Sequence, residues 1–144
     1  MELIEVINKR HSVRKYRQNI IVPIEVIKEI IELARKAPSA GGLRAYHIIV
    51  TCLKVTNQVD APYYLVICAD SEKSAKRYGD RGRNLYALQD ATIIGAYIQL
   101  IAVDMGLATV WIGTFNENKV KQMLKISDHL RPIAIIPIGY ERFN

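Results

Sequence analysis

The pattern of apolar and polar positions predicts two amphipathic helices near the start of the chain. The first covers Glu2 to Lys9, where apolar residues fall on one side. The second covers Pro23 to Lys36, because proline suits the first helical turn and Pro38 stops the helix. Its buried stripe is expected to consist of Ile24, Ile27, Ile30, Ile31 and Ala34.

Leu85 to Met105 predicts a third helix, roughly 30 Å long and apolar around most of its circumference. Its polar residues argue for a buried soluble helix rather than a membrane span. These residues are Gln89, Asp90, Gln99 and Asp104. One small domain cannot easily surround such a helix, so we expect a homodimer. Small residues would let a second helix approach closely, namely Gly95, Ala96 and Ala102.

Four apolar, β-branched stretches predict strands, and with the helices they indicate an α+β fold with one sheet in a single domain, residues 1–144. The stretches are Tyr46–Leu53, Tyr63–Ala69, Ala108–Gly113 and Arg131–Tyr140. The first is apolar on both faces, so His47 is expected to be a hydrogen-bonded core residue. Asp70 to Asn84 is expected to be a charged surface loop or active-site lid that could include one helical turn.

The prolines of the last predicted strand and a short capped helix add local detail. Pro132 and Pro137 indicate an edge, a bulge or a strand end. Asn116 is expected to cap a short helix that ends near Leu124.

Charge and cysteine usage restrict the possible partners. The net charge of +6 and a pI of about 9.4 favour anionic partners without choosing among them. Cys52 and Cys68 have no metal or redox spacing, so we expect buried reduced thiols in a cytoplasmic protein. Met1 to Lys9 is charged, so no secretory leader is expected, and the histidines show no metal-binding spacing.

Two stretches carry candidate chemistry. Arg10, Ser12 and Arg14 alternate, so an extended segment would present two guanidiniums and a hydroxyl on one face, as a phosphate clamp does. A solvated basic loop is the alternative. The second stretch is the small-residue loop after the second helix, whose backbone N–H groups would be open to a flat partner. It consists of Pro38, Ser39, Ala40, Gly41 and Gly42.

The ordered set of motifs resembles the flavin-dependent nitroreductase superfamily. It runs R-H-S-V-R-K-Y, A-P-S-A-G, aromatic-H-I-I-V, a long apolar helix, G-L-A-T-V-W-I-G and I-P-I-G-Y. The resemblance implies a mainly antiparallel sheet flanked by helices, a long buried central helix, FMN as cofactor and a homodimer. The stretches A-P-S-A-G-G-L and R-Y-G-D-R-G-R-N-L-Y-A-L are similar to the azoline dehydrogenase branch.

The resemblance also implies site residues, none of which is a catalytic acid, base or metal ligand. The FMN phosphate and ribityl chain would be held by Arg10, His11, Ser12 and Arg14, with Arg142 as a C-terminal addition. The isoalloxazine would lie against Pro38, Ser39, Ala40 and Gly41. Asn57 would meet the pyrimidine edge, and the N5 and O4 region would lie near Ile112, Gly113 and Thr114.

The implied activity is ping-pong hydride transfer from NAD(P)H, through flavin N5, to small electron-poor acceptors such as quinones and nitroaromatics. No nucleic-acid or membrane partner is expected for it. Two alternatives remain open: a peptide dehydrogenase of the azoline type, and a flavin- or nucleic-acid-binding protein without turnover.

Overall fold

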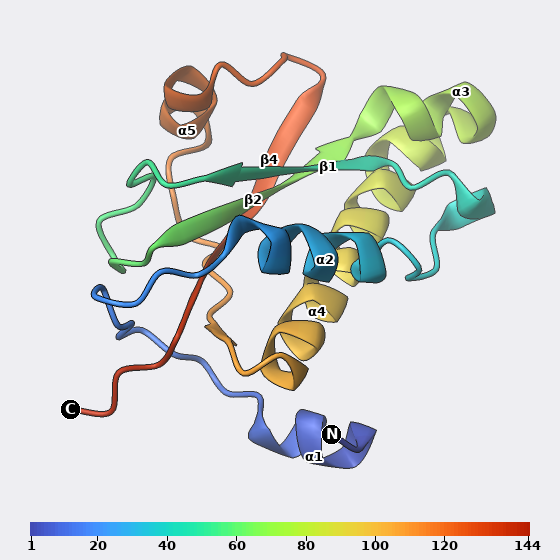
Figure 1. Ribbon diagram of the computed structural model, residues 1–144. Helices are drawn as coiled ribbons and strands as arrows, with labels where there is room; N and C mark the ends of the chain where they lie inside the picture. Colours follow the sequence, from blue (N-terminus) through green and yellow to red (C-terminus); the bar gives the residue numbers. More distant parts are fainter.

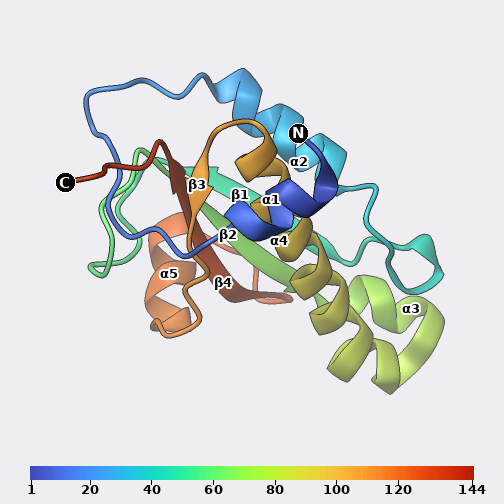
Figure 2. The same cartoon turned by 90° about the horizontal axis from the view of Figure 1, so that it is seen from below.

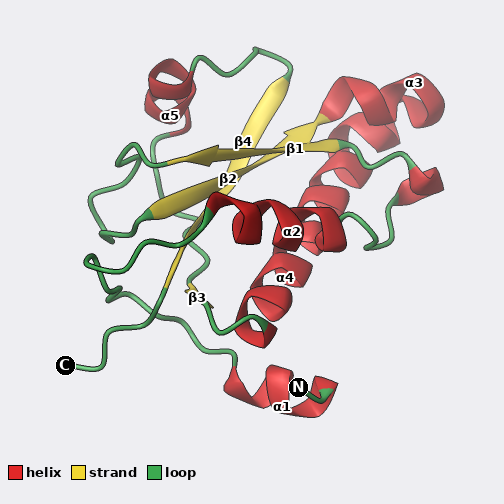
Figure 3. Ribbon diagram, in the orientation of Figure 1, coloured by secondary structure: helices red, strands yellow, loops and turns green.

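The computed structural model describes residues 1–144 as an α+β fold built on one antiparallel sheet (Figures 1 and 3). The sheet has four strands in the order β1-β2-β4-β3. The strands are β1 (Tyr46–Thr51), β2 (Tyr63–Asp70), β3 (Ala108–Thr109) and β4 (Leu130–Gly139). The helices are α1 (Leu3–Lys9), α2 (Ile24–Ala34), α3 (Ser71–Arg81), α4 (Ala87–Asp104) and α5 (Glu117–Leu124). The predicted fold class and its long central helix are confirmed.

Helices cover both faces of the sheet because the central strands are apolar at nearly every position. In β2, Leu65 and Ile67 face the cluster that contains Ile27 and Ile30 of α2 and the buried side of α4. Val66 faces the second cluster, which includes residues of α5. Figure 1 shows α2 and α4 on one side of the sheet and α5 on the other. Burial on both faces explains the near-continuous apolar runs of β2 and β4.

The central helix α4 is anchored by polar groups as well as apolar ones. Together with α3, it forms a helical stretch long and apolar enough to cross a membrane by length and composition alone. Asp90 and Gln99 of α4 are nevertheless buried within the protein and hydrogen-bonded there. The Gln99 Nε2 atom donates to the Thr109 hydroxyl at 3.1 Å. These bonds and the packing of α4 on the sheet identify it as a core helix.

The prediction that the first strand is covered on both faces is only partly confirmed. Ile48 and Val50 pack against one core cluster and Ile49 against the other. The strand β1 pairs only with β2, however, and most of its residues are only partly buried. His47 is not a core residue: its side chain is 59% exposed, with Nε2 3.7 Å from a carboxylate oxygen of Asp70. Cys52 just beyond β1 is exposed too, whereas burial raises the pKa of Cys68 to about 12.

The charged stretch from Asp70 to Asn84 is helical, which corrects its prediction as a loop. A carboxylate oxygen of Asp70 accepts a hydrogen bond from the Lys73 N–H at 3.1 Å and so caps α3. Gly79 interrupts α3 with a φ of 59°, and the π-helix η2 (Gly82–Tyr86) then leads into α4. The apolar pattern of the sequence did not predict this helix, because the only fully buried residue of α3 is the small Ser74.

The two prolines of β4 explain local departures from the predicted sheet. Pro132 lies beside the register shift between β2 and β4, which is the bulge that its presence indicated. The third strand is shorter than predicted, although Ile112 still bridges to Ile135. Continuing that register places Pro137 opposite Val110. Proline has no N–H to donate there, so the ladder is broken between Thr109 and Ile112.

Candidate functional site

The segment with the alternating arginines is extended, as the phosphate-clamp hypothesis requires. Ser12 forms a parallel bridge with Thr109, and the Val13 N–H donates to the Thr109 carbonyl at 3.0 Å. Val13 is buried, whereas Ser12 and Arg14 on either side of it are exposed. Neither Arg10 nor Arg14 forms an ion pair with a carboxylate. Two uncompensated guanidiniums therefore remain available to an anion.

A cavity of about 290 Å³, the Arg14 cavity, joins this segment to the end of the third predicted strand. Its polar rim is formed by Arg14, by the Gln58 amide and by the backbone of residues 112–114. The Gln58 Nε2 atom donates to the Thr114 carbonyl at 2.6 Å. The full lining is Arg14, Gln58, Val59, Val110, Trp111, Ile112, Gly113 and Thr114. A cation and an amide side chain thus border one space with residues 112–114.

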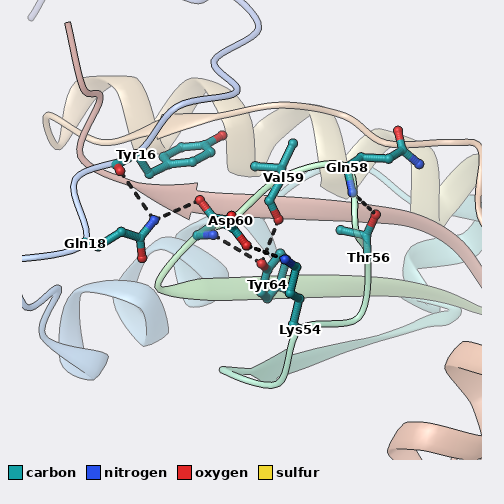
Figure 4. Close-up of polar contacts among 9 residues, drawn as sticks. Tyr16, Gln18, Lys54, Thr56, Gln58, Val59, Asp60 and Tyr64 are labelled. Atoms are coloured by element: carbon teal, nitrogen blue, oxygen red, sulfur yellow. Dashed lines mark hydrogen bonds and ion pairs between the residues drawn. The ribbon is translucent and has the colours of Figure 1, made fainter. Parts of the chain in front are cut away.

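Gln58, which the sequence reasoning missed, is held in place by the loop between β1 and β2. Its backbone N–H donates to the Thr56 hydroxyl at 3.2 Å, and the Tyr64 hydroxyl donates to the Val59 carbonyl at 2.8 Å (Figure 4). Gln18 joins the same loop through the Asp60 carbonyl at 2.9 Å. Asn57 lines a neighbouring cavity with Lys54 and Phe115 instead. The residue that borders the Arg14 cavity is therefore one position beyond the predicted one.

His11 and Arg142 lie outside the Arg14 cavity. The His11 Nε2 atom is 3.0 Å from a carboxylate oxygen of Glu141, and Nδ1 is 2.8 Å from the Lys9 carbonyl. The Lys9 carbonyl and the Glu141 carboxylate both raise the pKa of His11. Arg142 lines a different cavity, of about 530 Å³, with Arg17. Its backbone N–H nevertheless donates to the Lys15 carbonyl at 2.9 Å, so Arg142 lies beside the residue that follows Arg14.

The small-residue loop, Pro38–Arg44, lies against the start of α4. Asp90 fixes it, with one carboxylate oxygen accepting from the Ala40 N–H at 3.0 Å and the other from the Ala45 N–H at 3.2 Å. Other N–H groups of the loop donate to Ser39 or Ala40, namely those of Gly42, Leu43 and Arg44. The expectation that the N–H groups of this loop are open to a partner therefore fails for Ala40 and Gly42, whereas those of Ser39 and Gly41 donate to no protein acceptor.

The second cavity, of about 610 Å³, lies between this loop and α4 and is called the loop cavity. Pro38, Ser39 and Ala40 line it together with Tyr86 and Asp90. Gly41 does not border it. At Gly41 φ is +60°, and a Cβ there would lie 2.8 Å from an Arg77 guanidinium nitrogen and closer still to the Tyr78 hydroxyl. The glycine thus permits α3 to approach the loop.

The two cavities are separate within one chain. The loop cavity lies against residues 88–93 in the first turns of α4, whereas Trp111 of the Arg14 cavity packs against Gly95, farther along the helix. No residue lines both cavities.

Comparisons with known proteins agree with this architecture. The nitroreductase family model matches residues 7–56 and 52–140. A Methanothermobacter thermautotrophicus protein, assigned by name to NADH dehydrogenases and NAD(P)H nitroreductases, is 33% identical over 100% of this chain and 80% of its own length. A crystal structure of a nitroreductase family protein from Clostridium novyi is 33% identical, with a TM-score of 0.85, over 99% of this chain and 86% of that one.

A second solved structure carries a more specific name. It is an FMN-dependent nitroreductase from Clostridium difficile, 30% identical with a TM-score of 0.80, matched over 98% of this chain and 88% of that one. Because the family model covers most of the chain and a relative at this identity spans all of it, this chain belongs to the nitroreductase family.

Proposed function

We propose that the protein is an FMN-dependent oxidoreductase that passes hydride from NAD(P)H to small electron-poor acceptors such as quinones and nitroaromatics. The observation that carries the proposal is the Arg14 cavity, which combines an uncompensated guanidinium, the Gln58 amide and the backbone of residues 112–114. The name of the Clostridium difficile structure and that of the Methanothermobacter relative support the cofactor and the reductant. A cytoplasmic location is part of the proposal.

The residues present fit the chemistry of FMN. Arg10, Ser12 and Arg14 would hold the phosphate, because forked guanidiniums and a hydroxyl supply matching donors. The backbone of residues 112–114 and the Gln58 side chain would meet the polar edge of the ring. The apolar surface of residues 38–40 would support its flat face. When bound, FMN supplies the hydride transfer itself, so the chain's task is to bind, orient and exclude water.

A homodimer belongs to the same proposal. Because the Arg14 cavity and the loop cavity share no residue within one chain, a ligand that touches both groups would be held where two copies each contribute one of them. An apolar face is available for pairing, where α1 crosses α4 (Figure 2). A groove of about 620 Å³ lies there, and exposed Leu3 and Ile7 line it with Tyr97 and Leu100. Exposed apolar surface of this kind is typical of an interface.

The test begins with the colour of the purified protein. A flavin absorption band that NADH or NADPH bleaches without oxygen supports the proposal. Protein that binds no added FMN would remove it, and salt-sensitive binding of duplex DNA by such protein would favour the nucleic-acid alternative. Bound FMN that neither nicotinamide reduces would instead favour the azoline-type peptide dehydrogenase.

A further inference from the structure

We propose that Arg77 and Arg81 bind a carboxylate carried by the aromatic electron acceptor. The enzyme would then prefer anionic aromatic acceptors over neutral ones of the same size. This inference rests on the proposed function, because it names the acceptor class for the loop cavity.

The two arginines belong to an aromatic and cationic cluster beside the small-residue loop. The Arg77 guanidinium lies 5.4 Å from the Tyr78 ring centroid and 3.5 Å from the Gly41 carbonyl. The rings of Tyr78 and Tyr86 meet edge to face at 5.1 Å. The Arg81 Nε atom donates to the Tyr86 hydroxyl at 3.0 Å. Contacts with rings and a hydroxyl thus orient both guanidiniums without neutralising them.

Tyr86 connects this cluster to the loop cavity, because its side chain lines that space with Ser39 and Ala40. The backbone break at Gly79 and the π-helix that follows allow residues on both sides of the break to meet. Arg81 precedes the π-helix and bonds to its last residue. Tyr86 therefore borders the cavity where the acceptor would enter, and Arg81 lies directly beside it.

Neither Arg77 nor Arg81 forms an ion pair with a carboxylate, unlike the neighbouring Arg83. Arg83 forms ion pairs with Glu72 at 3.1 Å and with Asp80 at 2.6 Å, whereas Arg77 and Arg81 form none. Asp90, the acidic residue that lines the loop cavity, is hydrogen-bonded to backbone N–H groups. An anion from outside is the partner that this arrangement lacks.

The position of Arg77 favours an acceptor carboxylate over a nicotinamide phosphate. Its guanidinium contacts Gly41, so the charge lies at the edge of the loop on which the flavin ring would rest. A carboxylate on an aromatic acceptor is attached directly to the reacting ring. In a nicotinamide nucleotide, a ribose separates the reacting ring from the nearest phosphate.

The test compares Arg77→Gln, Arg81→Gln and the double variant with the unaltered holoenzyme. With saturating NADH, we expect the KM for 4-nitrobenzoate to rise about tenfold for each arginine, with kcat little changed. The KM for neutral 4-nitrobenzyl alcohol should stay the same. Arg83→Gln is the matched control, because it removes an equal charge from the same region while its own charge is already paired. The Kd of benzoate, measured by perturbation of the flavin spectrum, should rise in parallel.

Each outcome separates this inference from the proposed function. Variants that keep FMN and NADH oxidation but show the unaltered benzoate Kd and nitrobenzoate KM would overturn the inference alone. A raised KM for NADPH but not for nitrobenzoate would overturn it in favour of a nicotinamide phosphate. If the unaltered protein binds no FMN, the proposed function fails and the inference fails with it.

Discussion

A carboxylate oxygen of Asp90 accepts a hydrogen bond of 3.0 Å from the backbone N–H of Ala40, fifty residues earlier in the chain. With the second bond from Ala45, it fixes the small-residue loop to α4. Asparagine offers one oxygen and turns an NH2 group toward the other N–H, so Asp90→Asn should lower the free energy of unfolding by about 1–3 kcal/mol. It should also weaken FMN binding. Urea denaturation and flavin fluorescence titration measure the two effects.

Glu29→Gln is the control for this prediction, because Glu29 is exposed on α2 and lies outside both cavities and the groove. It should leave both quantities unchanged. An Asp90→Asn variant that is destabilised but binds FMN as tightly as before would contradict the role of the loop in cofactor binding.

Gly95 lies directly beneath the Trp111 ring, so a side chain has no room at this position. A Cβ would lie about 3.0 Å from one ring carbon of Trp111 and closer to another. Gly95→Ala should therefore destabilise the protein by about 1–3 kcal/mol, despite the better helix propensity of alanine. Denaturant unfolding measures the change. In the background of Trp111→Leu the same substitution should cost less, and an equal cost there would contradict the contact.

The fold could be predicted where local signals decide it. Asn116 predicted the start of α5, and its side chain accepts from the Lys119 N–H at 2.9 Å. Gly106, just beyond α4, has a φ of +79°, the left-handed conformation in which helices commonly end. Gly95 was assigned to contact with a second helix, whereas it accommodates Trp111 of the same chain. The incomplete burial of β1 was also not predicted. It follows from the edge position of β1, and strand order depends on pairings between distant segments that no local pattern records.

Like the fold, the candidate site could be predicted where local signals decide it, but not where contacts between distant segments do. Alternation predicted that Ser12 and Arg14 would share one face of an extended segment. The segment is extended at the bridge of Ser12 to Thr109, and both residues are exposed on either side of the buried Val13. The residues themselves gave no sign that Arg14 would meet Gly113, and only the family resemblance suggested it. Choosing between Asn57 and Gln58 required the side-chain contacts of a loop. Local spacing cannot supply those contacts.

The contact between His11 and Glu141 makes a small part of the stability depend on pH. The folded protein raises the pKa of His11 above its ordinary value of 6.5, through the Lys9 carbonyl and then Glu141. A raised pKa stabilises the fold fully below pH 6.5, and the stabilisation is lost as the pH rises through the folded pKa. The side chain is exposed, so the effect should stay under about 1 kcal/mol. Titration of the His11 ring protons by NMR measures that pKa.

Glu141→Gln should lower the pKa of His11 toward its ordinary value and flatten this part of the stability profile. The Lys9 carbonyl remains in the variant, so some of the increase should persist. An unchanged pKa in Glu141→Gln would show that the carboxylate contributes nothing.

Removal of both Arg10 and Arg14 should release the cofactor. Hydrogen bonds to charged groups contribute about 1.5–3 kcal/mol each, so the double alanine variant should bind FMN at least about 100-fold more weakly. Equilibrium dialysis with free FMN gives the Kd, and circular dichroism confirms folding. Arg17→Ala is the control, because Arg17 lines a different cavity. An unaltered Kd in the double variant would eliminate the phosphate assignment.

Ile7 gives the sharpest test of the proposed dimer. Its exposed side chain lines the groove between α1 and α4, so Ile7→Glu would place an unpaired carboxylate in the apolar contact. Such burial costs on the order of several kcal/mol, and sedimentation at micromolar concentration should show a monomer. Ile21→Glu, outside this groove, should remain dimeric. Because the proposed FMN site needs residues from two copies, the monomer should also lose flavin. A monomer that keeps its flavin would show that one chain suffices.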